Sequence, residues 1–257
     1  MFNALKLGFV SAVLCLMSVT SWGAHAASVG LRIERNVTTA RASMLLAERT
    51  LFAADQAINA AAIITSSLRV NRLVHTELNR IVQGIPGARA LLVIDEKGKL
   101  LHDSYKYPVL PLDLSDRSYF KEALSTEGIV IGEQVIGRTS GAPFVPIAKR
   151  IGELTFVVVI SPYVLVDLQN ECGDCWSSAV RKSDNNIITM FPPEGDLVPG
   201  LVLQLKPYLK NKDTGSLVVR YKHSVFSVVW TKSAEFPLLN ISVRGLTDSA
   251  AVEVDIN

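Results

Sequence analysis

The sequence predicts an α+β fold in which one long N-terminal helix backs two similar PAS-like modules, each with a central antiparallel sheet and flanking helices. Two observations carry this prediction. Residues 29–82 contain no proline and repeat small or apolar residues at helical spacing. After residue 83, short apolar runs alternate with turn residues, in the order two strands, a helical insert and three strands. This order then occurs a second time, which indicates an internal repeat.

The predicted helix over 29–82 carries a continuous stripe of small and apolar residues. They recur in alternating steps of four and three from Ile33 to Leu68, and a glycine- and proline-containing turn at 84–87 ends the helix. The stripe is expected to pack along the back of the modules. Its first half could also pair with a second copy or with a receptor of similar build, although many stripe positions are alanine.

Residues 1–26 resemble a leader segment. Lys6 precedes an uncharged apolar run, and Ala24, His25 and Ala26 fit a signal-peptidase site. The run is also long enough for an uncleaved membrane anchor. A cleaved signal is the favoured interpretation, and both interpretations place the rest of the chain outside the cytoplasm.

An exported chain makes the cysteine pair informative. Cys172 and Cys175 are expected to form a disulfide in an oxidising compartment, with free thiols or a redox pair as alternatives. Position 176 is Trp176, so the histidine of a haem-attachment motif is missing, and no second cysteine pair accompanies this one. We therefore expect no metal and no cofactor.

The two predicted modules span 83–162 and 163–247, followed by a tail at 248–257. The first is expected to contain a hairpin, a loop with a short helix at 111–125, and three strands, the first of them at 128–137. The second is expected to open with a connecting helix from Tyr163 and to repeat the same order.

The loop at 111–125 is the candidate site. Ser115 or Asp116 is expected to cap a helix that begins near Arg117. Tyr119 and Phe120 then lie about 100° apart on that helix, so that one faces a pocket and the other the core. We assign Tyr119 to the pocket and Phe120 to the core.

Two arginines give this candidate pocket its expected chemistry. Arg117 offers a fork of donors that suits a carboxylate, and Arg138 and Ser140 lie in a turn that could close the same pocket. The alternative is that Arg117 pairs with Asp113 or Asp116, or bonds backbone carbonyls, and only orders the loop.

Other function classes find no support in the sequence. His102, Asp103 and Ser104 are triad residue types, but neighbours on a strand point to opposite faces, and they are expected at the exposed end of a hairpin. No phosphate-binding loop or hydrolase motif is present. The net charge is only +2, without the basic stripe of a nucleic-acid binder. We expect neither an enzyme nor a nucleic-acid-binding protein.

Two phrases resemble a known family. Residues 113–120 read DLSDRSYF and residues 136–141 read IGRTSG. With the order of elements over 30–247, they resemble the double Cache sensor domains of bacterial receptors. The resemblance implies that the first module is membrane-distal and binds a small molecule outside the cell. It also implies that the long helix and the membrane-proximal second module pass the change to a cytoplasmic kinase, cyclase or chemotaxis module.

The chain departs from this family in two ways. We expect that no output module follows residue 257, and hence a stand-alone module that reports to a membrane receptor, or the remnant of a truncated kinase, cyclase or chemoreceptor. The amino-acid-binding version of the domain carries an Arg-x-Trp-Tyr phrase and a later aspartate. Here the phrase is Arg117-Ser118-Tyr119-Phe120, and the strand at 142–148 has no acid.

The expected protein is therefore a periplasmic or membrane-attached extracytoplasmic sensor of an organic anion such as a carboxylate. Its ligand-binding residues are expected to be Arg117, Tyr119, Arg138, Ser140 and Asp116. The alternative is an interaction protein whose pocket is filled by its own side chains.

Overall fold

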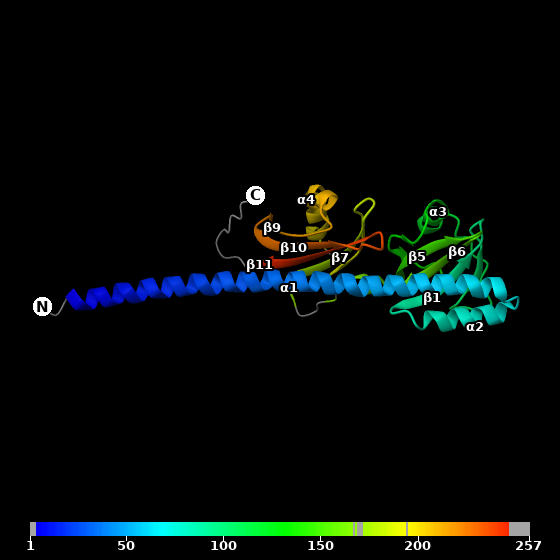
Figure 1. The fold of residues 1–257 in the computed structure, drawn as a ribbon, viewed down its shortest axis with the longest axis horizontal. Coiled ribbons are helices and arrows are strands. Elements are labelled where there is room, and N and C mark those ends of the chain that lie inside the picture. The colour runs from blue at the N-terminus through cyan, green and yellow to red at the C-terminus, as the bar shows by residue number, and fades with distance from the viewer. Residues whose placement is uncertain (1–3, 167, 169–171, 194, 247–257) are drawn as a thin grey trace.

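The computed structural model describes residues 4–166, 168, 172–193 and 195–246, with side chains from residue 28 onward. Helix α1 (Ala4–Ser67) runs along the whole molecule, and the two modules sit side by side on it (Figure 1). The side chains of the leader at 1–26, and the whole tail at 248–257, lie outside the described residues. Among the described residues, no helix combines the length and apolar character needed to cross a bilayer.

The single helix predicted over 29–82 is wrong at residues 68–70. Helix α1 ends at Ser67 and a second helix, α2 (Asn71–Val82), turns back beside it (Figure 1). Val70 has an extended backbone at this break, with φ −95° and ψ 110°. The reversal lets Val74 and Leu78 become buried in the first module's core, where an uninterrupted helix would have carried them past the sheet.

The first module contains one antiparallel sheet. Its elements are β1 (Ala88–Ile94), β2 (Leu100–Asp103), α3 (Ser118–Ser125), β3 (Val130–Ile131), β4 (Val135–Ile136), β5 (Pro143–Ile151) and β6 (Leu154–Ile160). The strand order is β2-β1-β6-β5-β3, and β4 also pairs with β5. The strand expected at 128–137 is thus divided into two short strands.

The second module repeats this arrangement. Its elements are η1 (Pro162–Leu165), β7 (Cys175–Arg181), β8 (Ile187–Phe191), α4 (Leu197–Asn211), β9 (Thr214–Tyr221), β10 (Ser224–Lys232) and β11 (Leu238–Leu246). The order β8-β7-β11-β10-β9 matches that of the first sheet, which confirms the predicted fold class. A disulfide joins Cys172 to Cys175 where β7 begins. Of the connecting helix expected from Tyr163, the described residues show only the 3-10 turn η1.

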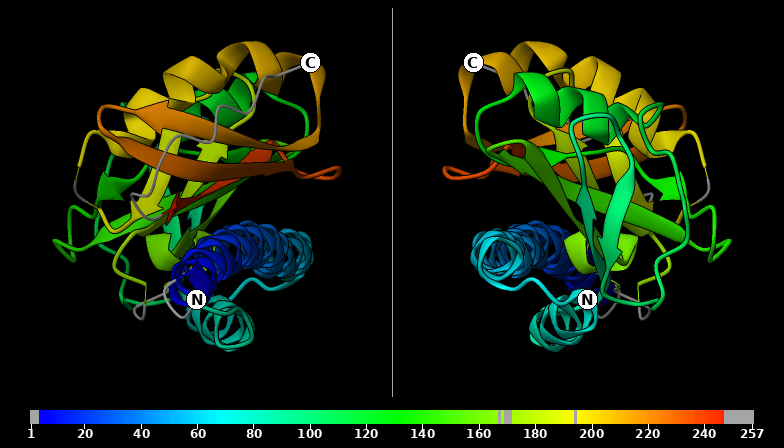
Figure 2. Two further views of the ribbon diagram at one scale, coloured as in Figure 1. Left: turned by 90° about the vertical axis from the view of Figure 1, so that its left-hand side faces the viewer. Right: turned by 90° about the vertical axis from the view of Figure 1, so that its right-hand side faces the viewer.

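Both sheets lie between two layers of helix (Figure 2). Helices α1 and α2 cover one side, and α3 and α4 cover the other. In β1, Leu91 and Val93 belong to the core that contains α1 and α2, whereas Ile94 packs with α3. This alternation follows from the two-residue period of a strand.

The faces that the two sheets turn towards α1 differ in polarity. In the first module that core is apolar, with Ile58 of α1 fully buried. In the second module α1 meets buried polar side chains. Asn36 of α1 donates from Nδ2 to the Ser227 carbonyl at 2.8 Å, and the Ser242 hydroxyl donates to Asn36 Oδ1 at 2.7 Å. The opposite face of the second sheet packs Trp230 against α4.

Candidate functional site

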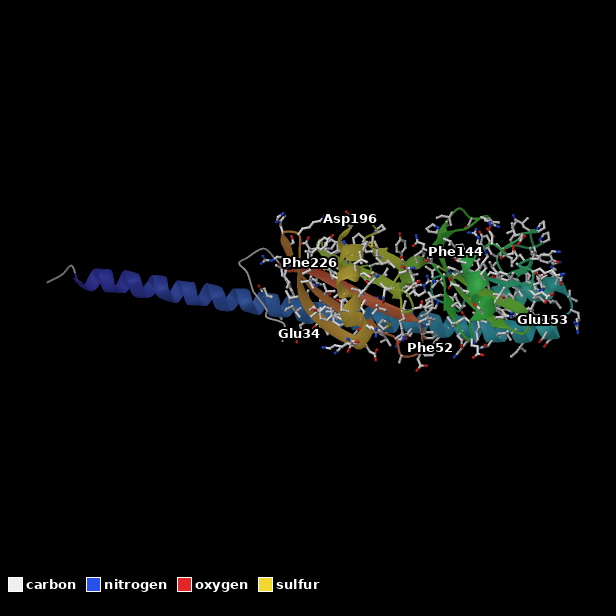
Figure 3. All side chains as sticks on the ribbon, turned by 90° about the horizontal axis from the view of Figure 1, so that it is seen from above. Glu34, Phe52, Phe144, Glu153, Asp196 and Phe226 are labelled. Carbon is white, nitrogen blue, oxygen red and sulfur yellow. A yellow bond between two sulfur atoms is a disulfide. The ribbon has the colours of Figure 1, made fainter. Side chains whose placement is uncertain are left out.

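A cavity of about 420 Å³ opens in the first module on the face of the sheet that packs against α3. The start of α3, the loop before it and the turn between β4 and β5 complete its walls. Its apolar lining residues are Ala90, Leu92, Leu100, Leu112, Leu114, Ala142, Phe144 and Val159. Its polar lining residues are Arg89, Asp103, Tyr105, Arg117, Tyr119, Arg138, Thr139 and Ser140. Phe144, one of the lining residues, is labelled in Figure 3 and shows where the first module lies.

Four of the five residues predicted for the site line this one cavity. Arg117 and Tyr119 come from α3 and its N-terminus, and Arg138 and Ser140 come from the turn between β4 and β5. Asp116 is not a lining residue. Segments more than twenty residues apart therefore meet at the cavity, as the prediction that Arg117 and Arg138 share one pocket requires.

Arg117 is the N-cap residue of α3, with extended backbone at φ −71° and ψ 132°. Its backbone N–H donates to the Leu114 carbonyl at 3.1 Å, which fixes the start of the side chain. Its Nε is buried and has no hydrogen-bond partner within the described part of the chain. Neither Asp113 nor Asp116 forms an ion pair with it there, so the predicted alternative pairing is absent. A buried polar group without a partner is costly unless a ligand supplies one.

The predicted cap of α3 is wrong. The helix begins at Ser118, and no side chain caps it. The Asp113 carboxylate instead accepts the Ser115 backbone N–H at 2.9 Å. Hydrogen bonds from Ser115 hold the pKa of Asp113 below its usual value. The approach to α3 is therefore an Asx-type turn, which places Arg117 at the helix start without a capping hydroxyl or carboxylate.

Arg138 closes the cavity from the opposite loop. It forms an ion pair with Asp116, and its Nη1 donates to the Asp113 carbonyl. Asp116 therefore neutralises Arg138, which is 40% exposed, rather than Arg117. The Ser140 hydroxyl accepts the Ala142 N–H at 3.3 Å and so shapes the same turn. Of the two arginines predicted for the site, Arg117 is the one that forms no ion pair among the described residues.

Tyr119 and Phe120 are both buried, at 1% and 3% exposure. Phe120 packs in the core with Ala148 and Val157, in the place that the sequence predicts. Tyr119 belongs to the same core and also forms part of the cavity wall. Burial raises the pKa of its phenol. The neutral hydroxyl group is thus available as a donor or acceptor.

Two charged residues of the cavity were not predicted from the sequence. Arg89, at the start of β1, lines the cavity and donates from Nη1 to the Pro143 carbonyl at 2.9 Å. Asp103, at the end of β2, also lines it and accepts the Tyr105 N–H at 2.8 Å. Burial raises the pKa of Asp103. Because side chains alternate along a strand, the side chain of Asp103 points away from those of its sequence neighbours. No pattern in the sequence predicts that a cavity lies beside it.

The segment at 102–104 is therefore not an exposed hairpin end. Ser104 is fully buried, and its hydroxyl accepts the Leu91 N–H at 2.8 Å. Its carbonyl accepts a hydrogen bond from Asn79 of α2 at 2.8 Å. In the part of the chain that the structure describes, no three histidine, cysteine or acidic side chains gather as a metal site.

Comparison of the sequence with protein-family models and with curated proteins finds no match. The structure is nevertheless similar to solved sensor domains. The extracellular domain of a protein described as the histidine kinase rpHK1S-Z16 gives a TM-score of 0.63 at 18% identity, covering 82% of this chain and 95% of that one. The ligand-binding domain of the Campylobacter jejuni chemoreceptor Tlp3, in complex with 4-methylisoleucine, gives 0.61 at 16% identity, covering 84% and 92%.

A third structure agrees with these two. It is a domain of a sensory box/GGDEF family protein from Vibrio parahaemolyticus, with a TM-score of 0.55 at 14% identity, covering 84% of this chain and 98% of that one. Each of the three alignments covers more than four fifths of this chain. The chain has the fold of a double Cache sensor domain.

Within this double Cache fold, the cavity offers three kinds of contact. Arg117 provides a positive pole, Asp103 provides an acid from β2, and aliphatic side chains such as Leu92 and Val159 provide apolar surface. A small molecule with one anionic end and an apolar body matches this arrangement. No base, nucleophile or metal site is needed to describe it.

Proposed function

We propose that this chain is an extracytoplasmic sensor module that binds a small organic carboxylate with an apolar body in the cavity of its first module. The observation that carries the proposal is the Arg117 guanidinium, which has no acidic partner among the described residues and lies at the wall of a mostly apolar cavity. A guanidinium fork matches a carboxylate in shape and charge, and apolar surroundings strengthen the attraction between them.

The size of the cavity supports the same ligand class. Its volume of about 420 Å³ falls in the range of small-molecule sites. Tlp3, which has a similar fold, has been crystallised with isoleucine, L-norvaline and L-valine. Each of these combines a carboxylate with an aliphatic side chain. Arg117 would hold the carboxylate, with Tyr119 and Ser140 beside it and Arg138 closing the turn.

Asp103 bears on the finer identity of the ligand. The strand at 142–148 has no acid, which favours a simple carboxylate over an amino acid. Asp103 supplies a carboxyl group from β2 instead. Its raised pKa makes it a poorer counter-charge for an ammonium group than an ordinary aspartate. We therefore place simple carboxylates first and include amino acids in the test.

A matched ligand panel tests this proposal. Thermal unfolding of the purified chain is measured with branched aliphatic carboxylates, the amino acids of the same skeleton, and the uncharged amides. A carboxylate at about 100 times its dissociation constant should stabilise the fold by about 2.7 kcal/mol, whereas its amide should not. Absence of stabilisation by every member of the panel would contradict the proposal.

A second candidate function is an interaction protein that senses no ligand. Leu31, Leu46 and Ile63 of α1 are 57%, 58% and 68% exposed, which favours contact with a second copy or with a membrane receptor through this helix. Light scattering of the purified chain decides between the two. A ligand-blind oligomer supports the second candidate, and a monomer that binds a carboxylate supports the first.

A further inference from the structure

The second module contains a hollow of its own, of about 520 Å³, between the C-terminal half of α4 and one end of the sheet. No residue lines both this hollow and the first-module cavity. Four lysines line it: Lys182, Lys206, Lys210 and Lys232. Asp213 is the one acidic residue among the described residues that line it. We call this feature the lysine hollow.

Only part of its positive charge is compensated. Lys232, at the end of β10, pairs with Asp213 at 3.2 Å, and Asp213 is 87% exposed. Lys182, just after β7, donates to the neutral carbonyl of Ser233. Lys206 and Lys210 form no ion pair within the described residues. Among the described residues, one carboxylate therefore accompanies the four lysines that line the hollow.

Helix α4 itself does not compensate this positive charge. Lys206 and Lys210 lie four residues apart on one face, and the helix contains no acidic residue between Leu197 and Asn211. Like charges at this spacing destabilise a helix. Lys210 also lies in the last turn, where the helix dipole favours a cation, but Lys206 lies a turn earlier. The properties of α4 alone therefore do not explain why both Lys206 and Lys210 are lysines.

The floor of the lysine hollow is apolar and its rim is polar. Leu209 and Leu239, both lining residues, are buried at 3% and 1% exposure. Ser183 and Asn185 line it from the turn between β7 and β8. An apolar floor lowers the local dielectric constant and strengthens the field of the ammonium groups. Compact ammonium groups, together with hydroxyl and amide groups, suit an oxyanion of the phosphate type.

We propose that the lysine hollow binds a small phosphate-type oxyanion that carries two or more negative charges. Such an anion would lie among four ammonium groups and cancel the repulsion between Lys206 and Lys210. A single negative charge would leave most of the repulsion in place. The site is separate from the cavity in which Arg117 is proposed to hold a monocarboxylate, and it does not depend on that proposal.

Pyrophosphate is the probe for this site. The full chain, in a mild non-ionic detergent at low ionic strength, is titrated with pyrophosphate by calorimetry. The wild type should bind one pyrophosphate, and the double variant Lys206→Gln/Lys210→Gln should bind it at least about tenfold more weakly. Asp213→Asn should bind it severalfold more tightly, because the competing carboxylate is gone. Both lysines are exposed and glutamine is a good helix former, so the double variant should keep its fold.

A matched control separates a site from diffuse charge. Lys97→Gln/Lys99→Gln removes two exposed lysines from the turn between β1 and β2, outside the lysine hollow, and should leave pyrophosphate binding unchanged. Three results would overturn the proposal. They are no saturable binding by the wild type, equal weakening in the control variant, and acetate binding as tightly as pyrophosphate. Arg117→Ala should not alter pyrophosphate binding, so the failure of one proposal is distinguishable from the failure of the other.

Discussion

Asp103 shows how the cavity perturbs a single residue. Its carboxyl group sits at the end of β2, on the cavity wall, and burial raises its pKa above the ordinary value. The Tyr105 N–H, which donates to Oδ1 at 2.8 Å, opposes this shift without cancelling it. A raised pKa in the folded state means that folding favours the protonated form.

The sign of the resulting pH dependence follows from proton linkage. Between the unfolded and the folded pKa of Asp103 the folded state binds more protons, so this residue's contribution to stability falls as the pH rises. Asp103→Asn keeps an oxygen acceptor for Tyr105 and removes the titration. Relative to the wild type, the variant should gain stability as the pH rises from the unfolded pKa of Asp103 through its folded pKa. Urea unfolding at several pH values measures this, and a difference that does not change with pH would contradict it.

At the residue scale the sequence predicted which side chains meet, but not how they pair. Arg117, Tyr119, Arg138 and Ser140 line one cavity because an aromatic-bearing helix and a glycine-containing turn follow strands of one sheet. Their function as ligand contacts stays a prediction. The Asp116–Arg138 ion pair joins residues 22 positions apart, and no local pattern specifies such a contact.

At the scale of elements, α1 is held to the second sheet by polar groups. Asn36 is 1% exposed, and its side chain bonds the Ser227 carbonyl and the Ser242 hydroxyl. Further along α1, the Ser43 hydroxyl accepts a hydrogen bond from Asn240 at 3.0 Å. Because buried polar groups need partners, these bonds fix the register of the helix on the sheet.

Truncating Asn36 should therefore destabilise the protein more than a surface change does. Asn36→Ala leaves the Ser227 and Ser242 groups buried without their partner, and should lower the free energy of unfolding by about 2–3 kcal/mol. Thr38→Ala, on the exposed side of α1, should change it by less than about 0.5 kcal/mol. Denaturant titration measures both. Equal effects would show that the buried polar bonds add nothing to stability.

A second link between elements joins the two modules through Arg181. This residue ends β7, and its side chain is only 12% exposed. It pairs with Glu122 of α3 at 3.2 Å and with Glu133, before β4, at 3.1 Å. Asp184 in its own module completes the cluster at 2.7 Å. The helix that begins beside Arg117 is thus tied to the second sheet.

Removing this arginine should weaken the contact between the modules. Arg181→Ala should cost about 1–3 kcal/mol of stability, because charge-assisted hydrogen bonds are lost. The three carboxylates that remain are partly exposed and stay hydrated, which keeps the loss below that of a fully buried pair. Arg220→Ala, an exposed arginine of β9, is the matched control. If both variants unfold at the same urea concentration, the cluster contributes no stability.

The element boundaries that sequence reasoning missed share a cause. The break at 68–70 contains neither glycine nor proline, so the reversal of α2 is decided by burial of its apolar face against the first module. Division of the expected strand at 128–137 likewise arises where it meets β5 and the cavity loop. In both places, tertiary packing overrides a locally adequate pattern.

At the scale of the whole molecule, one apolar core connects both modules. Leu51 and Ile58 of α1 share it with Leu91 of the first sheet and Leu238 of the second. The repeat of strand order was predictable because each hairpin and each three-strand run carries its own turn signals. The cavity walls formed by the start of β1 and the end of β2 were not, since they come from segments far from the predicted loop and turn.

The central claim is that Arg117 holds the carboxylate of a ligand in this cavity, and titration calorimetry on Arg117→Ala tests it most directly. The best carboxylate from the ligand panel is titrated into the wild type, Arg117→Ala and Arg72→Ala, which removes an exposed arginine of α2. Loss of a charge-assisted hydrogen bond should weaken binding to Arg117→Ala by at least about tenfold, while Arg72→Ala binds as the wild type does. Wild-type affinity in Arg117→Ala, with the fold intact, would contradict the account.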